Sequence, residues 1–559
     1  MQARRQHLSG RIVDLFARRI FPGTIEWASG RIVRLTEDPK VREKHYIAPG
    51  FVDAHIHIES SMLPPAEFAR WSVVHGTVAT VSDPHEIANV LGAAGVNYMV
   101  RDGKRTPFKF NFGAPSCVPA TTFETAGASL DARAVAKLLA RPEIKYLSEV
   151  MNFPGVLARD KSLMAMIAAA KKRGKPVDGH APGLRGEVAA NYAAAGITTD
   201  HECFTLPEAR DKRKVGMKIL IREGSAARNF AALEPLLKTD AEACMFCCDD
   251  LHPDLLMVRH LDEHVRRAIR GGADLFEVLR CASVNPVEHY QLDVGLLRAG
   301  DPADFIVFDG WADLKVRRTY LRGEMVARDG RSLLRRQPSK TPNAFRARPR
   351  RVEEFAVRWN GLTPGRSKRA GVSALHLNLI EALNGQLITR HQREAPRVAA
   401  GHLVADPGRD ILKIAVVNRY TPKAPVAVAF IKGIGLKAGA IASSVAHDSH
   451  NIVAIGADDA SLCAAVNLVI KARGGISVVG RGKRAVLPLP IAGLMSDLDG
   501  RVVARRYTAL DAAAKRLGSK LDAPFMTLSF MALLVIPDLK LSDRGLFSAA
   551  KWGFVPVVE

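Results

Sequence analysis

Short apolar segments alternate with longer helix-like stretches through the first half of the chain. Eight such segments occur between about residue 51 and residue 251: FVDAHIHI, TVATVSDP, FKFNFGAP, KYLSEVM, KPVDGHAP, ITTDHECF, MKILIREG and CMFCCDDL. Strands that alternate with helices favour a parallel sheet. Eight units in roughly 200–250 residues are typical of a closed (β/α)8 barrel. An open doubly wound sheet is the alternative.

The two ends of the chain have different patterns. Residues 1–49 contain short β-like pieces such as GRIVDLF and GRIVRL, separated by Pro-Gly and Ser-Gly turns. From about residue 370, strand patterns such as DILKIAVVN and NIVAIGA mix with the helical pattern of DDASLCAAVNLVIKARGG. This second pattern predicts a separate α/β domain.

Composition and charge narrow the class of protein. A chain of 559 residues is too long for one ordinary core, and 47% apolar with 25% charged residues is typical of a soluble globular protein. The net charge of +23 raises the question of whether the protein binds nucleic acid. However, residues 331–369 hold twelve Lys and Arg against two Glu and match no nucleic-acid motif. We interpret this segment as a solvated basic connection and expect no nucleic-acid partner.

The sequence also carries signals about location. No apolar run reaches the roughly 18 residues that a membrane helix needs, so we expect no membrane partner. The first residues contain no long apolar run of the secretory type. Seven cysteines are an odd number, without the density of a disulfide scaffold. These features predict a cytoplasmic protein.

Histidines and acids stand at the ends of most of the apolar segments. They are His55 and His57; Asp83, His85 and Glu86; Glu149; Asp178 and His180; Asp200, His201 and Glu202; and Asp249 and Asp250. In a parallel barrel the carboxyl ends of the strands meet at one face. Imidazole nitrogens and carboxylate oxygens are ligands of Zn²⁺, Mn²⁺ and Fe²⁺.

His55 and His57 are one residue apart, so in a strand both imidazoles point to the same face. A single buried histidine is more often a hydrogen-bonded core residue than a ligand. Burying four histidines and two acids together without a cation would be costly. A two-metal site with a bridging carboxylate needs about this number of groups. The pattern therefore predicts a metal centre.

Longer strings resemble one family. The strings PGFVDAHIHIESSM, SDPHEIANV, SEVMNFPGV, GHAPGL, GMKILIREGSAARN and RCASVNP are similar to the bacterial adenine deaminase family of the amidohydrolase superfamily. The later strings VAHDSHNI and LPLPIAGLMSD resemble the second half of the same family. The resemblance covers nearly the whole chain.

The resemblance implies which residues hold metal. By position, two divalent ions would be held by His55, His57, Glu149, His180, His201 and Asp249. Many amidohydrolases use a carboxylated lysine on the fourth strand, whereas here Glu149 stands at that strand's carboxyl end. Lys145 is at its start, and we interpret it as structural. The set has two carboxylates and no thiolate, which favours Mn²⁺ or Fe²⁺ over Zn²⁺.

The resemblance also implies a domain organisation, with a small β-domain built from both ends of the barrel segment. The predicted parts are 1–49 and 299–335 for the small β-domain, 50–298 for the metal-binding barrel, 336–369 for the basic connection and 370–559 for the C-terminal α/β domain.

The implied reaction is hydrolysis of adenine to hypoxanthine and ammonia. We expect a hydroxide that bridges the two ions to attack C6, with Asp249 orienting it and moving its proton. His85 and Glu86 are candidates for catalysis at a ring nitrogen. His85 and Glu59 are candidates for substrate binding. The string SDPHE is also good N-capping sequence, and both roles are compatible.

Several alternatives stay open at this stage. The same chemistry on another aminopurine or a cyclic amide is the alternative function, because fold and ligands do not fix the substrate. Nucleic-acid binding through the basic segment is a third hypothesis. Cys244 and Cys247 form a CxxC pair, but without a second pair we favour packing over metal binding. Residues 447–450 form either an interdomain contact or a loop over the substrate. A homo-oligomer is compatible with the sequence.

Overall fold

The computed structural model describes residues 5–359 and 375–559, which form two compact units. The first unit contains residues 1–85, 96–116 and 130–339. The second unit contains residues 86–95, 117–129 and 340–559. Two short stretches from the first half of the sequence therefore belong to the second unit.

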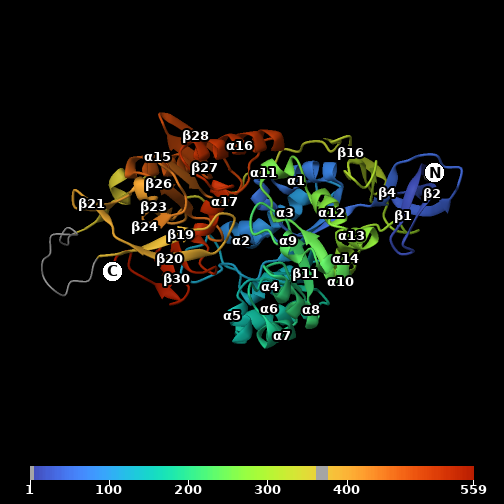
Figure 1. The fold of residues 1–559 in the computed structure, drawn as a ribbon, viewed down its shortest axis with the longest axis horizontal. Helices are drawn as coiled ribbons and strands as arrows, with labels where there is room; N and C mark the ends of the chain where they lie inside the picture. The colour runs from blue at the N-terminus through green and yellow to red at the C-terminus, as the bar shows by residue number, and fades with distance from the viewer. Residues whose placement is uncertain (1–4, 360–374) are drawn as a thin grey trace. The chain divides into compact units, whose positions relative to one another are not determined.

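The centre of the first unit consists of parallel strands (Figure 1). A six-stranded sheet has the order β13-β5-β6-β7-β8-β9, and a three-stranded sheet has the order β10-β11-β12. The strands are β5 (Phe51–His57), β6 (Thr77–Ser82), β7 (Lys109–Ala114), β8 (Ile144–Val150), β9 (Val177–Gly179), β10 (Thr199–Asp200), β11 (Lys218–Arg222), β12 (Cys244–Cys247) and β13 (Asp249–Asp250). The predicted mixed α/β content with a parallel sheet is confirmed. Each of the eight apolar segments contains a strand, and Cys248 divides the eighth into two.

Helices follow most of these strands. They are α1 (Pro65–Ser72), α2 (His85–Leu91), α3 (Ala93–Gly103), α4 (Ala132–Leu139), α5 (Phe153–Leu157), α6 (Lys161–Lys171), α7 (Gly186–Ala194), α8 (Leu206–Lys214), α9 (Phe230–Leu233), α10 (Leu236–Thr239), α11 (Pro253–Leu256), α12 (Leu261–Arg270), α13 (Leu275–Ala282) and α14 (Val284–Tyr290). Helix α12 shows why such stretches are helical. Leu261, Val265 and Ala268 are buried on one face at helical spacing. Acids occupy its first turn and arginines its last, which suits the helix dipole.

A third sheet of the first unit joins the two ends of that unit's sequence. Its order is β17-β16-β15-β14-β4-β1-β2-β3, and only the β1–β4 pair is parallel. The strands are β1 (Gln6–Asp14), β2 (Arg19–Ala28), β3 (Arg31–Glu37), β4 (Tyr46–Pro49), β14 (Phe305–Phe308), β15 (Val316–Leu321), β16 (Glu324–Arg328) and β17 (Arg331–Ser332). Trp27, Phe305 and Tyr320 pack together in its core. The indole of Trp27 donates to the carbonyl of Gly323 at 3.1 Å, which satisfies its buried N–H.

The second unit is built on a mostly antiparallel sheet of order β20-β19-β24-β23-β26-β25-β27-β28. Its strands are β19 (Leu377–Ala382), β20 (Thr389–Glu394), β23 (Leu412–Val417), β24 (Val426–Lys432), β25 (Ala440–Ser443), β26 (Ile452–Gly456), β27 (Gly475–Gly480) and β28 (Lys483–Pro488). Two three-stranded sheets and two further helices complete it: β18 (Val357–Arg358), β21 (Arg397–Ala399), β22 (His402–Val404), β29 (Leu539–Ser542), β30 (Gly545–Ser548), β31 (Gly553–Phe554), α16 (Gly500–Arg516) and α17 (Pro524–Ser529).

Helix α15 (Asp459–Ala472) packs on this sheet and supplies much of its core. Asp458 caps the helix by accepting from the backbone N–H of Ser461 at 2.7 Å. Leu462, Val466 and Val469 are fully buried at helical spacing. The helix matches the pattern from which it was predicted. Throughout the described ranges, no helix combines the length and the apolar character that a membrane crossing requires.

The basic segment is not uniformly exposed. Phe345 and Phe355 lie in the same core as α15, and the guanidinium of Arg350 is buried. Nη1 of Arg350 donates to Glu354 and to the carbonyl of Ala424, both at 3.0 Å. Part of the segment therefore packs into the second unit, because Phe345 and Phe355 supply apolar surface that a solvated linker would lack. The predicted stretch 360–369 lies outside the described residues.

Candidate metal centre

The two histidines of β5 present their Nε2 atoms to the same point. The whole strand is buried, and the two Nε2 atoms are 3.3 Å apart. The Nδ1 of His57 lies 3.2 Å from the carbonyl oxygen of Asp83. A proton on Nδ1 satisfies that carbonyl and leaves the Nε2 lone pair available to a ligand. The alternation of side chains along a strand therefore produces the predicted pair.

Glu149, at the carboxyl end of β8, lies between two groups of imidazoles. Its Oε1 is 3.2 Å from Nε2 of His57 and 3.5 Å from Nδ1 of His85. Its Oε2 is 2.6 Å from Nδ1 of His180 and 3.3 Å from Nε2 of His201. Burial alone would raise the pKa of Glu149, but His180 and the other imidazoles lower it well below its usual value. A carboxylate in this position has the geometry of a bridging ligand.

Asp249 approaches the same point from β13, the neighbour of β5. It pairs with Ile56 and adopts a left-handed backbone conformation, with φ of 57°. Its Oδ1 lies 3.0 Å from Nε2 of His57 and 3.5 Å from Nε2 of His55. The eighth apolar segment thus delivers a carboxylate to the histidines of the first.

Arg222 and Glu202 complete the cluster; the sequence reasoning counted Glu202 among the acids at segment ends without assigning it a role, and it missed Arg222. Arg222 is fully buried at the end of β11, and its Nη1 donates to Glu202 at 2.6 Å and to Asp249. Burial would raise the pKa of Asp249, but Arg222 lowers it well below the usual value. One feature of the sequence could have pointed to Arg222. The apolar run KILIR ends in this arginine, at the position where other segments end in histidines and acids.

The donor set fits divalent metal ions. Several groups of side chains bring their ligand atoms within coordination reach of one another, among them His55, His57 and Asp249; His55, Glu149 and His201; and His180, His201 and Glu202. Within the described part of the chain, the buried Nδ1 of His55 and Nε2 of His180 have no hydrogen-bond partner. Imidazole nitrogens and carboxylate oxygens of this kind suit Mn²⁺, Fe²⁺ and Zn²⁺.

The structure brings all six predicted ligands together in the first unit: His55, His57, Glu149, His180, His201 and Asp249. His85 joins them, since its Nδ1 lies near Glu149 and 3.2 Å from Asp83. The carboxylate of Asp83 also accepts from the backbone N–H of His85 at 3.0 Å. The capping role predicted for SDPHE and a place for His85 in the cluster therefore coexist.

Glu86, the next residue, belongs to the second unit. Its carboxylate pairs with Nδ1 of His447 and with Nε2 of His450. The ring of His447 stacks on Phe530 with centroids 4.5 Å apart. Both imidazoles of residues 447–450, for which the sequence left two roles open, are therefore engaged by one acid. Glu59 is buried in the short 3-10 turn Ile58–Ser61 that directly follows β5.

Two further acids near the cluster have structural partners. The carboxylate of Asp250 accepts from the hydroxyl of Ser60, a partner outside the six predicted ligands. Asp53 accepts from Nε2 of His260 at 2.9 Å and from the backbone N–H groups of His55 and Cys248. It thereby holds the backbones of β5 and of the segment before β13 in register.

The cysteines of the eighth segment remain thiols. Burial raises the pKa of Cys244 to about 12 and raises the pKa of Cys247 well above its ordinary value. A neutral thiol is a poor metal ligand. The interpretation of this CxxC pair as packing residues is therefore supported.

Comparison with known proteins gives matches along nearly the whole chain. The amidohydrolase family model matches residues 46–326, and the adenine deaminase C-terminal domain model matches residues 386–552. The chain is 56% identical over 549 residues to an adenine deaminase of Salinibacter ruber, which covers 98% of each protein. It is 55% identical over 544 residues to one of Sulfurovum sp. (97% of this chain, 98% of the relative) and 49% identical over 548 residues to one of Methanosarcina mazei (98% of each). From these matches, the chain is an enzyme that belongs to the adenine deaminase family of amidohydrolases.

Proposed function

We propose that the chain hydrolyses adenine to hypoxanthine and ammonia with the help of two divalent metal ions. The observation that carries this proposal is the convergence of four imidazoles and two carboxylates around Glu149. The identity of 56% with a protein named adenine deaminase supports the choice of substrate.

The proposed ligands divide into two groups that share Glu149. His55, His57 and Asp249 would hold one ion, and His180 and His201 the other. When bound, two divalent ions supply a water molecule that is nucleophilic at neutral pH. The set includes two carboxylates and no thiolate, which favours Mn²⁺ or Fe²⁺ over Zn²⁺.

Asp249 is the proposed proton carrier. Arg222 occupies one of its carboxylate oxygens, which fixes the orientation of the group and leaves Oδ1 directed at the histidines. From there Oδ1 would orient the attacking water, accept its proton and pass it toward the leaving amine. The attack would take place at C6 of the purine.

Three other side chains are proposed to bind the purine ring or to take part in catalysis on it. His85 would donate to a ring nitrogen as negative charge develops there, while Asp83 orients its imidazole. Glu86 is proposed to share in catalysis, with its carboxylate held by two imidazoles. Glu59, buried after the histidine strand, is proposed to bind substrate.

We further propose that the two parallel sheets are arcs of one closed (β/α)8 barrel. The first and last strands, β5 and β13, are hydrogen-bonded in parallel. At the other junction, the N–H of Thr198 donates to the carbonyl of Val177 at 2.9 Å, which links β10 to β9. Closure would place all the strand ends that carry metal ligands around one mouth. The flanking sheet would be the predicted small β-domain.

We also propose a cellular location and a partner for the protein. Seven cysteines that are all free and buried fit a reducing compartment, so we keep the cytoplasm as the proposed location. The expected partner is a small purine, and the state of oligomerisation stays open.

The test is ammonia release from adenine by protein of known metal content. Turnover that rises with metal content and is selective for adenine supports the proposal. A parallel panel of other aminopurines and cyclic amides tests the alternative substrate. Rapid turnover of one of those compounds, with none of adenine, would replace the substrate but keep the metal chemistry.

A further inference from the structure

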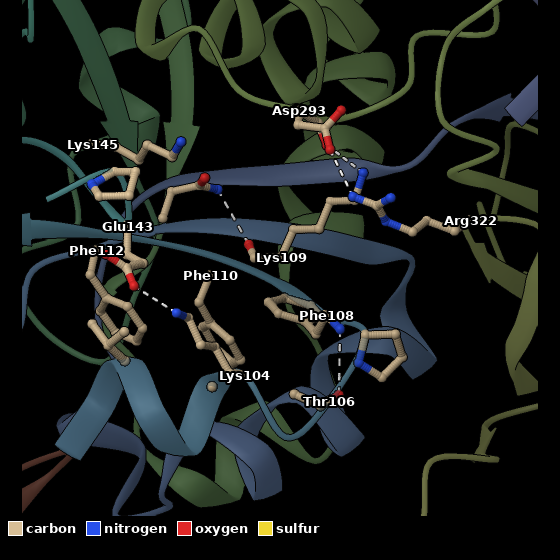
Figure 2. Close-up of a pocket in the computed structure, with 15 residues that line it drawn as sticks. Lys104, Thr106, Phe108, Lys109, Phe110, Phe112, Glu143, Lys145, Asp293 and Arg322 are labelled. Atoms are coloured by element: carbon tan, nitrogen blue, oxygen red, sulfur yellow. Dashed lines mark hydrogen bonds and ion pairs between the residues drawn. The ribbon is translucent and has the colours of Figure 1, made fainter. Parts of the chain in front are cut away.

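A cavity of about 570 Å³ lies in the first unit at the amino ends of β7 and β8 (Figure 2). The metal-ligand cluster lies at the carboxyl ends of the strands, with Glu149 near the end of β8. The cavity is therefore at the opposite end of these strands. Its volume is in the range of small-molecule sites. None of its lining residues belongs to the cluster around Glu149.

One wall of the cavity is aromatic. Phe108, Phe110 and Phe112 alternate along the chain, so their rings lie on one side of β7 (Figure 2). The rings of Phe110 and Phe112 are stacked at 5.6 Å, and those of Phe108 and Phe110 lie 4.7 Å apart. Phe108 and Phe112 are buried, whereas Phe110 keeps part of its surface exposed. This wall can stack a flat ring.

The rim of the cavity carries cations. Lys104 pairs with Glu143 at 2.6 Å, and Arg322 pairs with Asp293 at 2.8 Å. These are exposed pairs, which are weak and open readily in water. Figure 2 shows both pairs at the edge of the cavity.

Lys145 has no such partner. It lines the cavity near the aromatic wall, and within the described residues it forms no hydrogen bond or ion pair. The sequence had suggested a structural role for this lysine at the start of β8. An unpaired, partly buried ammonium beside a cavity is a site for an anion.

Asn111 stands between Phe110 and Phe112 in β7, so its side chain is on the opposite side of the strand from the aromatic wall. Its amide nitrogen donates to the carbonyls of Thr80 and Lys109, at 3.1 and 3.3 Å. The features of the cavity that can hold a ligand are therefore the flat apolar wall and the unpaired cation.

We propose that this cavity binds a small anion that carries a flat aromatic ring, of which a nucleoside monophosphate is the representative. The ring stacks on Phe110, and the phosphate pairs with Lys145. Lys104 can turn from Glu143 to the same phosphate. The proposal does not depend on the reaction proposed for the metal centre.

The experiment is calorimetric titration of the full-length protein with uridine 5′-monophosphate at low salt. A pyrimidine is chosen because the metal centre is proposed to bind a purine. We expect saturable binding that weakens about tenfold or more in Lys145→Gln, since charge-assisted contacts are the strong ones. Phe110→Leu should also weaken it. Lys137→Gln, on the exposed face of α4 and outside the cavity, makes the same charge change and should bind like the parent.

Further titrations test which parts of the nucleotide the cavity recognises. Uridine and inorganic phosphate should each bind more weakly than the nucleotide, because each lacks half of the contacts. Asp249→Asn should bind the nucleotide like the parent. The proposal is overturned by absence of saturable binding, by unchanged binding in folded Lys145→Gln, by phosphate binding as tightly as the nucleotide, or by loss of binding in Asp249→Asn.

Discussion

The guanidinium of Arg222 donates to one carboxylate oxygen of Asp249, whose other oxygen lies 3.0 Å from Nε2 of His57. The same Nη1 donates to Glu202 at 2.6 Å. One buried cation therefore balances two acids, and it leaves one oxygen of Asp249 free to work at the metal centre. The pKa of Asp249 is lowered in consequence, which keeps it ionised at neutral pH.

Replacing Arg222 by glutamine should damage both stability and turnover. Removal of one partner from a buried ion pair typically costs about 3–5 kcal/mol, because the other charge stays buried. Denaturant unfolding and ammonia release measure the two effects. Arg228→Gln is the matched control, since Arg228 is half-exposed and 3.7 Å from Glu223. An Arg222→Gln protein as stable and active as the parent would contradict this account.

Asp249→Asn should keep the fold and much of the metal but lose most of its turnover. The amide cannot accept a proton at neutral pH, and general acid–base help is typically worth about 10²–10⁴-fold. Asp250→Asn should cost much less, because that carboxylate accepts from Ser60 outside the cluster. Steady-state ammonia release and metal content are measured on the same samples. If Asp250→Asn is the inactive variant, the assigned roles are reversed.

Fully loaded protein should contain two ions per chain. The grouped ligand atoms on either side of Glu149 provide places for two, and a chelator should remove activity together with metal. Mn²⁺ or Fe²⁺ should restore turnover better than Zn²⁺. Elemental analysis of reconstituted, active protein decides the number, and one ion per chain rejects the two-metal proposal.

Stability should acquire a pH dependence from His289. Burial, with help from Lys218, lowers the pKa of this histidine to about 4. Between its ordinary pKa of about 6.5 and 4, the unfolded chain binds a proton that the folded chain does not. The contribution of His289 is therefore full above about 6.5 and is lost as the pH falls through 4.

The variant His289→Gln removes this titration and can still pair with the hydroxyl of Thr198, which lies 3.2 Å from Nε2 in the parent. The stability of the parent relative to the variant should fall by about 1–3 kcal/mol between pH 6.5 and 4. Denaturant unfolding at several pH values measures this difference. A constant difference across the range would show that His289 titrates normally.

The basic segment should tolerate loss of its exposed charges. Replacing Arg335, Arg346, Arg351 and Arg358 by glutamine should leave turnover of adenine within about threefold of the parent. Arg350→Gln is the contrasting variant, because that side chain is buried and should lower stability. Collapse of turnover in the fourfold variant, with fold and metal intact, would give the segment a catalytic role.

The sequence allowed much of the candidate site to be predicted because strand geometry is simple. His55 and His57 share a face by alternation, and Glu149 and Asp249 end strands that run in the same direction. Arg222 escaped notice because a buried arginine is explained only by its partners. Those partners, Glu202 and Asp249, come from two other segments.

Glu86 shows a second limit of sequence reasoning. Adjacent residues in SDPHE suggest one site, yet Glu86 is engaged by His447 and His450, more than 350 residues later. Its surroundings depend on the fold of the distant segment. The same holds for Lys145, whose lack of a partner is a property of the cavity and not of its position in β8.

The second unit has consequences for how the protein is made. Residues 86–95 and 117–129 leave the ribosome early, but their partners are synthesised late: Thr125 donates to Asp543, 418 residues downstream. These stretches must wait for their late partners through most of translation. A fragment that starts at residue 340 lacks both of them, so cutting the gene between the two halves would not yield two self-sufficient products. We therefore expect these stretches to need protection while the chain is synthesised. A fragment designed to express the second unit should include them.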